Sequence, residues 1–245
     1  MQQQITQADK VKKNIRMAVT RFSRLAIGFG LWAAMAVAAR AATVDVDVHD
    51  EHGAPVADAV ISLLPLDRPA PAAVDAHAVI DQRHLSFVPQ VLVVQTGTRV
   101  SFPNSDNVRH HVYSFSPAKT FQLKLYAGNH GSAETFDRPG VVTLGCNIHD
   151  WMLGYIVVID SPWFAKTGAD GRAEIPDVPA GRYTLHLWHP RQAVGTPVVA
   201  QAVTLGNGIL SRHFTLSLHP AEQTNAPPPG LEIGLGDRLG EAHAH

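Results

Sequence analysis

The sequence predicts an all-β fold, and three features of the residue pattern lead to this class. Valines at positions 44, 46 and 48 alternate with polar residues at 45, 47 and 49, the period-two pattern of a strand with one buried face. Short apolar runs recur along the chain between turn residues, and no convincing long amphipathic helix is found. Regularly spaced short strands are typical of a β-sandwich or a Greek-key barrel.

The expected strands form three blocks. The first block has strands at 44–48 and 57–64, and residues 65–82, rich in Pro, Ala and Asp, are expected to form a connecting loop. The second block has strands at 85–89, 91–94, 99–102, 112–115, 140–145 and 155–159. The third block follows a turn at 167–171 and has strands at 172–175, 182–188, 198–205 and 212–218. Residues 219–245 are rich in Pro, Gly and charge without periodicity, and they are predicted to be a disordered tail.

The first 41 residues have the pattern of a secretory signal peptide. Six basic residues precede the uncharged run Leu25–Ala39, and Ala39-Arg40-Ala41 offers small residues at both key positions of a cleavage site. The alternative is a membrane anchor, but a run of 15 residues is shorter than the roughly 20 needed to span a bilayer. We therefore expect an exported, periplasmic protein without a stable membrane span after cleavage. Met17 is an alternative start, because a well-formed signal begins there.

The charge of the chain changes when this segment is set aside. The whole chain has a formal net charge of −1, but seven of its 20 basic residues and one of its 21 acidic residues lie in positions 1–41. The remainder has 13 basic and 20 acidic residues, a net charge of −7. This balance argues against a nucleic-acid partner, which requires a strongly basic face.

The chain has one cysteine and 14 histidines. One cysteine excludes an intrachain disulfide and any site that needs two thiolates. A lone thiol is unusual in an exported protein, because such compartments oxidise thiols. Binding to a metal ion is one way to protect it.

The sharpest motif is the spacing C-x2-H-x2-M formed by Cys146, His149 and Met152. Upstream, His110 and His111 stand near the start of an expected strand. One thiolate and two imidazoles with a weak axial thioether form the trigonal blue-copper site. A binuclear copper centre is excluded because it needs a second cysteine, and a structural zinc site is disfavoured for the same reason.

Residues 84–160 resemble the cupredoxins, the blue copper family that includes plastocyanin, and are most similar to amicyanin and pseudoazurin. Those two proteins use the same short C-x2-H-x2-M loop. The resemblance rests on the loop and on matching segments before and after it: 87–89, 97–98, 100–104, 110–112, 135–140 and 152–158.

The resemblance implies one mononuclear type 1 copper ion held by His110, Cys146, His149 and Met152. His111 stands where the family has an Asn that braces the ligand loop, and it is the alternative upstream ligand in place of His110. Asp150 is a second departure from the family. An acid beside His149, the usual electron exit in this family, should favour Cu(II) and discourage anionic partners.

The flanking segments are similar to the carboxypeptidase-regulatory-like domain, an immunoglobulin-like β-sandwich. Residues 53–63 match its first strands, and its later Asp-Gly turn and Pro-x-Gly-x-Tyr signature occur at 169–172 and 178–183. We therefore expect one discontinuous domain, formed by residues 43–66 and 161–218, into which the cupredoxin domain at 84–160 is inserted. The alternative is two unrelated flanks packed on the cupredoxin domain.

These features predict a protein that carries single electrons between periplasmic redox partners, such as a dehydrogenase and a cytochrome. The resemblance to amicyanin also suggests a link to methylamine or amine oxidation. The first alternative is a copper carrier or storage protein that releases its ion. The others are an oxidase or reductase subunit, which needs an open second metal site, and a metal-free structural module. No catalytic triad, phosphate loop or carboxylate pair is found in the sequence, so we do not expect an enzyme.

Overall fold

The computed structural model describes residues 41–128, 132–192 and 199–220, and for them the prediction of an all-β fold is confirmed. All the regular secondary-structure elements in these ranges are β-strands. The predicted signal peptide at 1–41 lies outside the described residues except for Ala41, and so does the predicted tail from residue 221 onward. Within the described part, no helix is long and apolar enough to cross a membrane.

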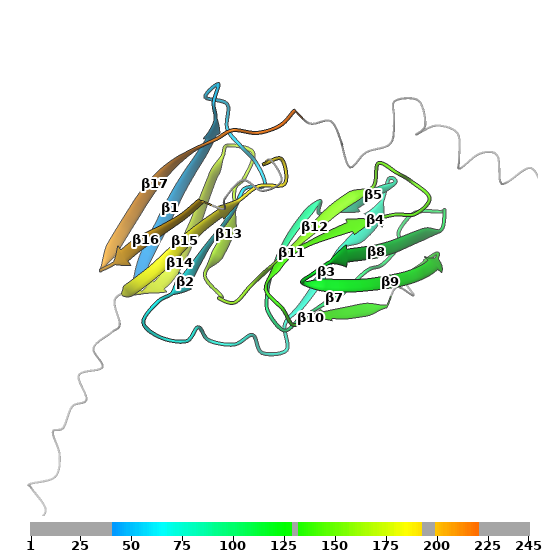
Figure 1. Ribbon diagram of the computed structural model, residues 1–245, viewed down its shortest axis with the longest axis horizontal. Coiled ribbons are helices and arrows are strands. Elements are labelled where there is room, and N and C mark those ends of the chain that lie inside the picture. Colours follow the sequence, from blue (N-terminus) through cyan, green and yellow to red (C-terminus); the bar gives the residue numbers. More distant parts are fainter. Residues whose placement is uncertain (1–40, 129–131, 193–198, 221–245) are drawn as a thin grey trace, which may run out of the picture. The chain divides into compact units, whose positions relative to one another are not determined.

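The first and third blocks of the sequence pair with each other in two sheets (Figure 1). One sheet has the order β14-β1-β17, and the other has the order β13-β2-β15-β16. The strands are β1 (Ala41–Asp50), β2 (Val60–Pro65), β13 (Phe164–Lys166), β14 (Arg172–Pro179), β15 (Gly181–Trp188), β16 (Val199–Leu205) and β17 (Gly208–Leu216).

The two sheets share one apolar core. The alternating valines of β1 turn inward, and Val44 and Val48 are fully buried. They belong to the same cluster as Leu185 and Leu187 of β15 and as Tyr183, the largest fully buried side chain. Strands from both sides of the central block thus build one β-sandwich. The assignment of this sandwich to the carboxypeptidase-regulatory-like family stays a prediction.

His189, directly after β15, is a buried and neutral part of this sandwich. Its Nε2 lies 3.1 Å from the carbonyl oxygen of Ala57, and its Nδ1 accepts a hydrogen bond from the backbone N–H of Arg191. The ring therefore carries its proton on Nε2. A second proton on Nδ1 would break the hydrogen bond that this atom accepts from Arg191. Burial lowers the pKa of His189 to about 4, against the opposing hydrogen bond to Ala57.

We expect the free energy of unfolding to fall as the pH drops from about 6.5 to about 4. In that window the unfolded chain protonates His189 while the folded protein does not, so acid favours unfolding by up to ~1.4 kcal/mol per pH unit. Urea denaturation at a series of pH values measures the slope. His189→Gln should flatten it between pH 6.5 and 4, and equal slopes in the two proteins would contradict this assignment.

The central block forms a second β-structure with one larger and two smaller sheets. The sheet orders are β6-β12-β11-β8-β9, β10-β7-β3 and β4-β5. The strands are β3 (His77–Val79), β4 (Asp81–Arg83), β5 (Ser86–Val88), β6 (Val91–Gln95), β7 (Thr98–Ser101), β8 (His110–Ser116), β9 (Lys119–Tyr126), β10 (Ala133–Phe136), β11 (Gly140–Gly145) and β12 (Leu153–Ile159).

The prediction of a loop over residues 65–82 was wrong at its end. β3 pairs in parallel with β7, and β4 pairs with β5, so the strands of this block begin at His77 rather than at residue 85. Ile80, between the two strands, is fully buried. The apolar stretch around Ile80 is short and is surrounded by Pro, Ala and Asp residues, so the sequence pattern did not indicate strands there. β9, β10 and β13 were also not predicted.

The core of the central block lies directly behind the predicted ligand loop. Phe102 and Phe136 are fully buried, and their ring centroids lie 6.5 Å apart. Cys146 and Met152 belong to the same cluster. Packing of the core therefore fixes both ends of the loop between β11 and β12.

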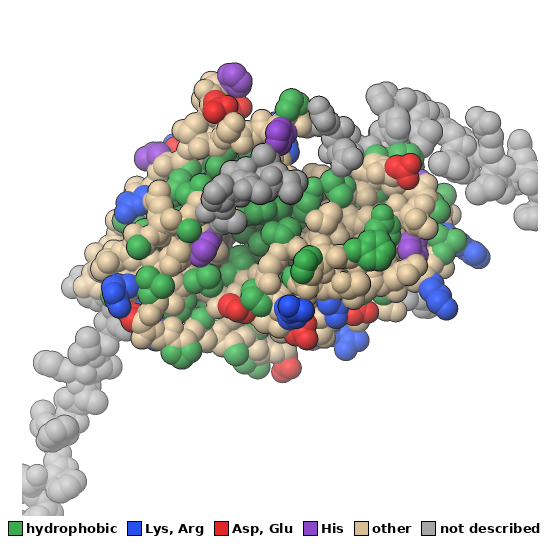
Figure 2. All heavy atoms as spheres, viewed as in Figure 1, with side chains coloured by type: hydrophobic (Ala, Val, Ile, Leu, Met, Phe, Trp, Pro, Cys, Tyr) green, Lys and Arg blue, Asp and Glu red, His purple; other side chains and the backbone are tan. Residues whose placement is uncertain are grey.

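The surface carries mixed charge. Figure 2 shows acidic and basic side chains interspersed with hydrophobic ones on the face that it draws, without a continuous basic patch there.

Candidate metal centre

Strand register brings distant parts of the chain together at the predicted metal site. His110 is the first residue of β8, and Cys146 directly follows β11. Gly145, the last residue of β11, pairs with Tyr113 of β8, which places the end of one strand beside the start of the other. His149 lies on the loop that leads from Cys146 to β12.

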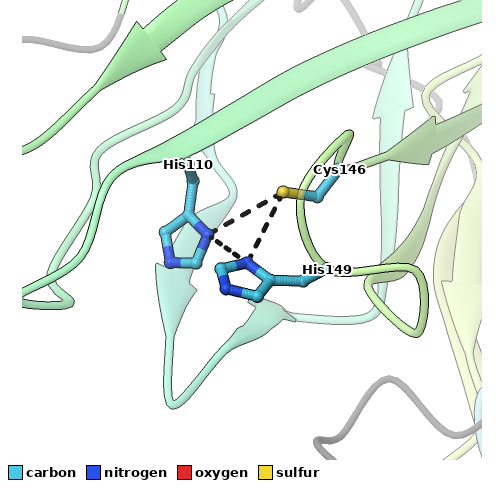
Figure 3. Close-up of side chains that lie close together, drawn as sticks. All are labelled: His110, Cys146 and His149. Carbon is cyan, nitrogen blue, oxygen red and sulfur yellow. Dashed lines mark hydrogen bonds between the residues drawn. The ribbon is translucent and has the colours of Figure 1, made fainter. Parts of the chain in front are cut away.

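Three donor atoms converge at this point (Figure 3). The Cys146 Sγ atom lies 3.9 Å from Nδ1 of His110 and 3.7 Å from Nδ1 of His149, and the two nitrogens are 3.2 Å apart. A point equidistant from these three atoms would lie about 2.1 Å from each, within the roughly 2.0–2.3 Å of zinc bonds to nitrogen and sulfur. The donor set therefore fits a single metal ion. Among the described residues this is the one group of three His, Cys, Asp or Glu side chains that converge in this way.

The site is closed to solvent on most sides. His110 is fully buried, Cys146 is 4 % exposed, and His149 is half-buried at the edge. Met152 is also buried, and its backbone N–H donates to the carbonyl oxygen of His149, which tightens the loop. Met152 shares the core cluster of Cys146, and its role as the fourth ligand stays a prediction.

The surroundings of Cys146 favour the thiolate. Burial raises the pKa of the thiol, but the hydrogen bond to His110 and those from the backbone N–H groups of His111, Ile148 and His149 outweigh burial. The pKa of Cys146 therefore lies below its ordinary value. Because the thiolate is the form that binds metal ions, the loop prepares this side chain as a ligand.

The two imidazoles differ in their electrostatics. Burial lowers the pKa of His110, but the hydrogen bonds to Cys146 and Asp106 reverse the effect and leave it raised. Burial and the neighbouring His110 lower the pKa of His149. His149 thus favours the neutral form that a metal ion requires.

Asp106 is a residue of the site that the sequence did not indicate. Its Oδ2 lies 2.9 Å from Nε2 of His110, the ring nitrogen that faces away from Cys146. Its carboxylate also accepts the backbone N–H groups of His84 and Leu85. The only hint in the sequence was an acid four residues before His110, a weak signal without the fold.

The structure turns the ring of His111 away from the three converging donors. Nε2 of His111 lies 2.7 Å from the side-chain amide nitrogen of Gln122 and accepts its hydrogen bond. The Nδ1 atom is buried without a hydrogen-bond partner among the described residues. The backbone of His111, by contrast, supports Cys146 through its N–H group.

Trp151 packs over the loop. Its indole N–H donates to the carbonyl oxygen of Leu85, and its ring lies 5.2 Å from that of His149. Trp151 thus braces His149 from one side. The neighbouring Asp150 is exposed.

The chain is similar to solved cupredoxin structures over a part of its length. A copper-containing nitrite reductase from Thermus scotoductus SA-01 is 26% identical over 39% of this chain, with a TM-score of 0.33. The chain spans only 25% of that reductase. A purple cupredoxin from Nitrosopumilus maritimus is 24% identical, with a TM-score of 0.31, over 35% of this chain and 100% of its own. A reduced amicyanin mutant is 21% identical, with a TM-score of 0.33, over 40% of this chain and 98% of its own. No protein-family model and no curated protein matches the chain.

Proposed function

We propose that this chain is an exported type 1 copper protein that carries single electrons between redox partners in the periplasm. The observation that carries the proposal is the convergence of one thiolate sulfur and two imidazole Nδ1 atoms at mutual distances of 3.2–3.9 Å. This donor set, with Met152 following on the same loop, is typical of blue-copper electron-transfer sites. His110, Cys146 and His149 would hold the ion, and Met152 would add a weaker thioether ligand.

The donors combine soft sulfur with imidazole, so one set of ligands suits both oxidation states of copper. Copper bound there would supply a one-electron couple between Cu(II) and Cu(I). The chain's own contribution is rigidity. Cys146 belongs to the packed core, His110 is fully buried, and backbone N–H groups hold the sulfur in place. Ligands that do not move between the two states keep the cost of electron transfer low.

His149 is the group best placed to face a partner. It is the least buried of the three converging residues, and Trp151 holds its ring from one side. We propose that electrons enter or leave at this edge. A dehydrogenase or a cytochrome is the class of partner that fits, with a link to amine oxidation as the narrower form of the proposal.

The alternative is a copper carrier or storage protein. The same three ligands would serve it, and the half-buried His149 would be the route by which the ion leaves. An enzymatic role would require a second, open metal site.

The experiment that tests the proposal follows the copper ion through repeated redox cycles. The copper-loaded protein is reduced with ascorbate and reoxidised with ferricyanide, and its copper content is measured after each cycle. Electron transfer predicts full retention and equal recovery of the oxidised spectrum. Loss of the ion to an equimolar apo-acceptor during the reduced phase would instead support copper carriage.

A further inference from the structure

We propose that Asp106 is a positioning residue of the metal centre, whose carboxylate orients His110 and stabilises Cu(II) relative to Cu(I). The inference rests on the proposed function. It assigns a role to a residue outside the ligand set.

The carboxylate of Asp106 is mostly buried and is held in place by hydrogen bonds. Only 13% of the Asp106 side chain is exposed. Oδ1 accepts the backbone N–H of His84 at 2.7 Å, and Oδ2 accepts that of Leu85 at 2.9 Å. The same Oδ2 lies 2.9 Å from Nε2 of His110. Both oxygens are therefore engaged, and the group has little freedom to rotate.

The two N–H donors come from a strained turn. His84 and Leu85 join β4 to β5 with φ angles of +54° and +56°. Two consecutive left-handed residues of a two-residue hairpin are ordinarily Asn or Gly, because a Cβ is disfavoured there. Here the hydrogen bonds to Asp106 hold the turn. Backbone strain of this kind is concentrated at functional sites.

The loop that carries Asp106 is fixed from its other side by Asn104. The backbone N–H of Asp106 donates to Oδ1 of Asn104. The Asn104 side-chain amide donates to the carbonyl oxygens of Val108 and Tyr126. Asn104 itself is buried. The carboxylate thus approaches His110 from a rigid support.

This geometry has two consequences for a bound ion. A proton held on Nε2 of His110 by Asp106 leaves the Nδ1 lone pair directed toward Cys146 and His149. The negative charge of the carboxylate also makes the imidazole more electron-rich and favours the more highly charged ion. Asp150, which is exposed beside His149, carries the same charge in a position where water and salt screen it.

The test compares Asp106→Asn with Asp150→Asn in the copper-loaded full chain. In Asp106→Asn the amide oxygen of the new side chain can replace Oδ2 and keep the bonds to Leu85 and His110. The amide nitrogen takes the place of Oδ1 and cannot accept the N–H of His84, so the variant removes the charge and this one hydrogen bond at nearly unchanged side-chain size. We expect the preference for Cu(II) over Cu(I) to fall about tenfold, which raises the reduction potential by about 59 mV. Asp150→Asn should raise the reduction potential by less than a third of that amount. The shift caused by Asp150→Asn should become smaller between 10 mM and 500 mM salt, whereas the shift caused by Asp106→Asn should not. Equal shifts in the two variants, or a lowered potential in Asp106→Asn, would overturn the proposal.

A second measurement needs neither copper nor a variant. In metal-free protein labelled with ¹⁵N-histidine, NMR should detect the Nε2-bound proton of His110, shifted downfield and protected from exchange. A ring without that proton, or with one that exchanges freely, would contradict the contact with Asp106. Failure to bind copper would instead refute the proposed function and leave this result standing.

Discussion

Replacing Cys146 with serine is expected to abolish the intense visible absorption of the copper-loaded protein. The absorption arises from charge transfer between the thiolate and Cu(II), and a serine hydroxyl of similar size stays protonated and cannot replace it. Changes to groups that only support a metal ligand typically cost about 10–100-fold in affinity, so loss of the ligand itself should exceed about 100-fold. Copper titration monitored by absorption and by competition with a chelator measures both effects.

The Cys146→Ser variant must first be shown to keep the wild-type fold. Cys146 lies in the packed core, and serine adds one buried polar group there, which costs on the order of 1–3 kcal/mol of stability. Circular dichroism at room temperature should therefore show the same β-rich spectrum as the wild type. A folded Cys146→Ser protein that keeps the intense band would contradict the assignment of the thiolate.

The second large effect separates the two adjacent histidines. We expect His110→Ala to lose the type 1 spectrum and at least about 100-fold in copper affinity, because it removes one of three converging donors. His111→Ala should retain the intense band, because the variant keeps the backbone N–H that bonds to Cys146 and loses ring contacts with Gln122 and Tyr113, neither of which is a converging donor.

The matched pair is measured by parallel copper titration of the two purified variants. Both changes remove one buried imidazole from neighbouring positions of β8, so unspecific damage to the strand would affect them alike. Retention of the band in His110→Ala and its loss in His111→Ala would reverse the assignment and make His111 the upstream ligand.

The parts of the fold that were predicted from sequence are those with a local signal. In β1 the valines alternate with polar residues, and β11 is a short apolar run. Both patterns match the burial of the strand itself, so the local sequence is enough to predict a strand. The loop ligands were predicted for the same reason, because three residues at fixed spacing between two strands share one turn of the chain. His110 and Cys146 meet because Gly145 pairs with Tyr113, a long-range strand pairing that was not predicted.

Two of the missed features, β3 and Asp106, depend on partners far away in the sequence. β3 is three residues long and acquires its place from parallel pairing with β7. β9 lies at a sheet edge with only Leu123 buried. Its sequence does alternate Phe121, Leu123 and Leu125 with polar residues, a local strand signal that the prediction did not use. Asp106 was missed because its role depends on three contacts, with His84, Leu85 and His110. The types of these residues do not indicate such contacts in the sequence.

Titration of the purified, metal-free chain with Cu(II), followed by visible absorption and electron paramagnetic resonance, tests directly whether Cys146, His110 and His149 form a type 1 copper centre. We expect an intense thiolate-to-copper band that rises linearly and stops at one equivalent, with the small hyperfine splitting of a type 1 centre. A protein that stays colourless, binds no copper, or binds it only with the large splitting of a solvent-exposed site would show that these residues do not form such a centre.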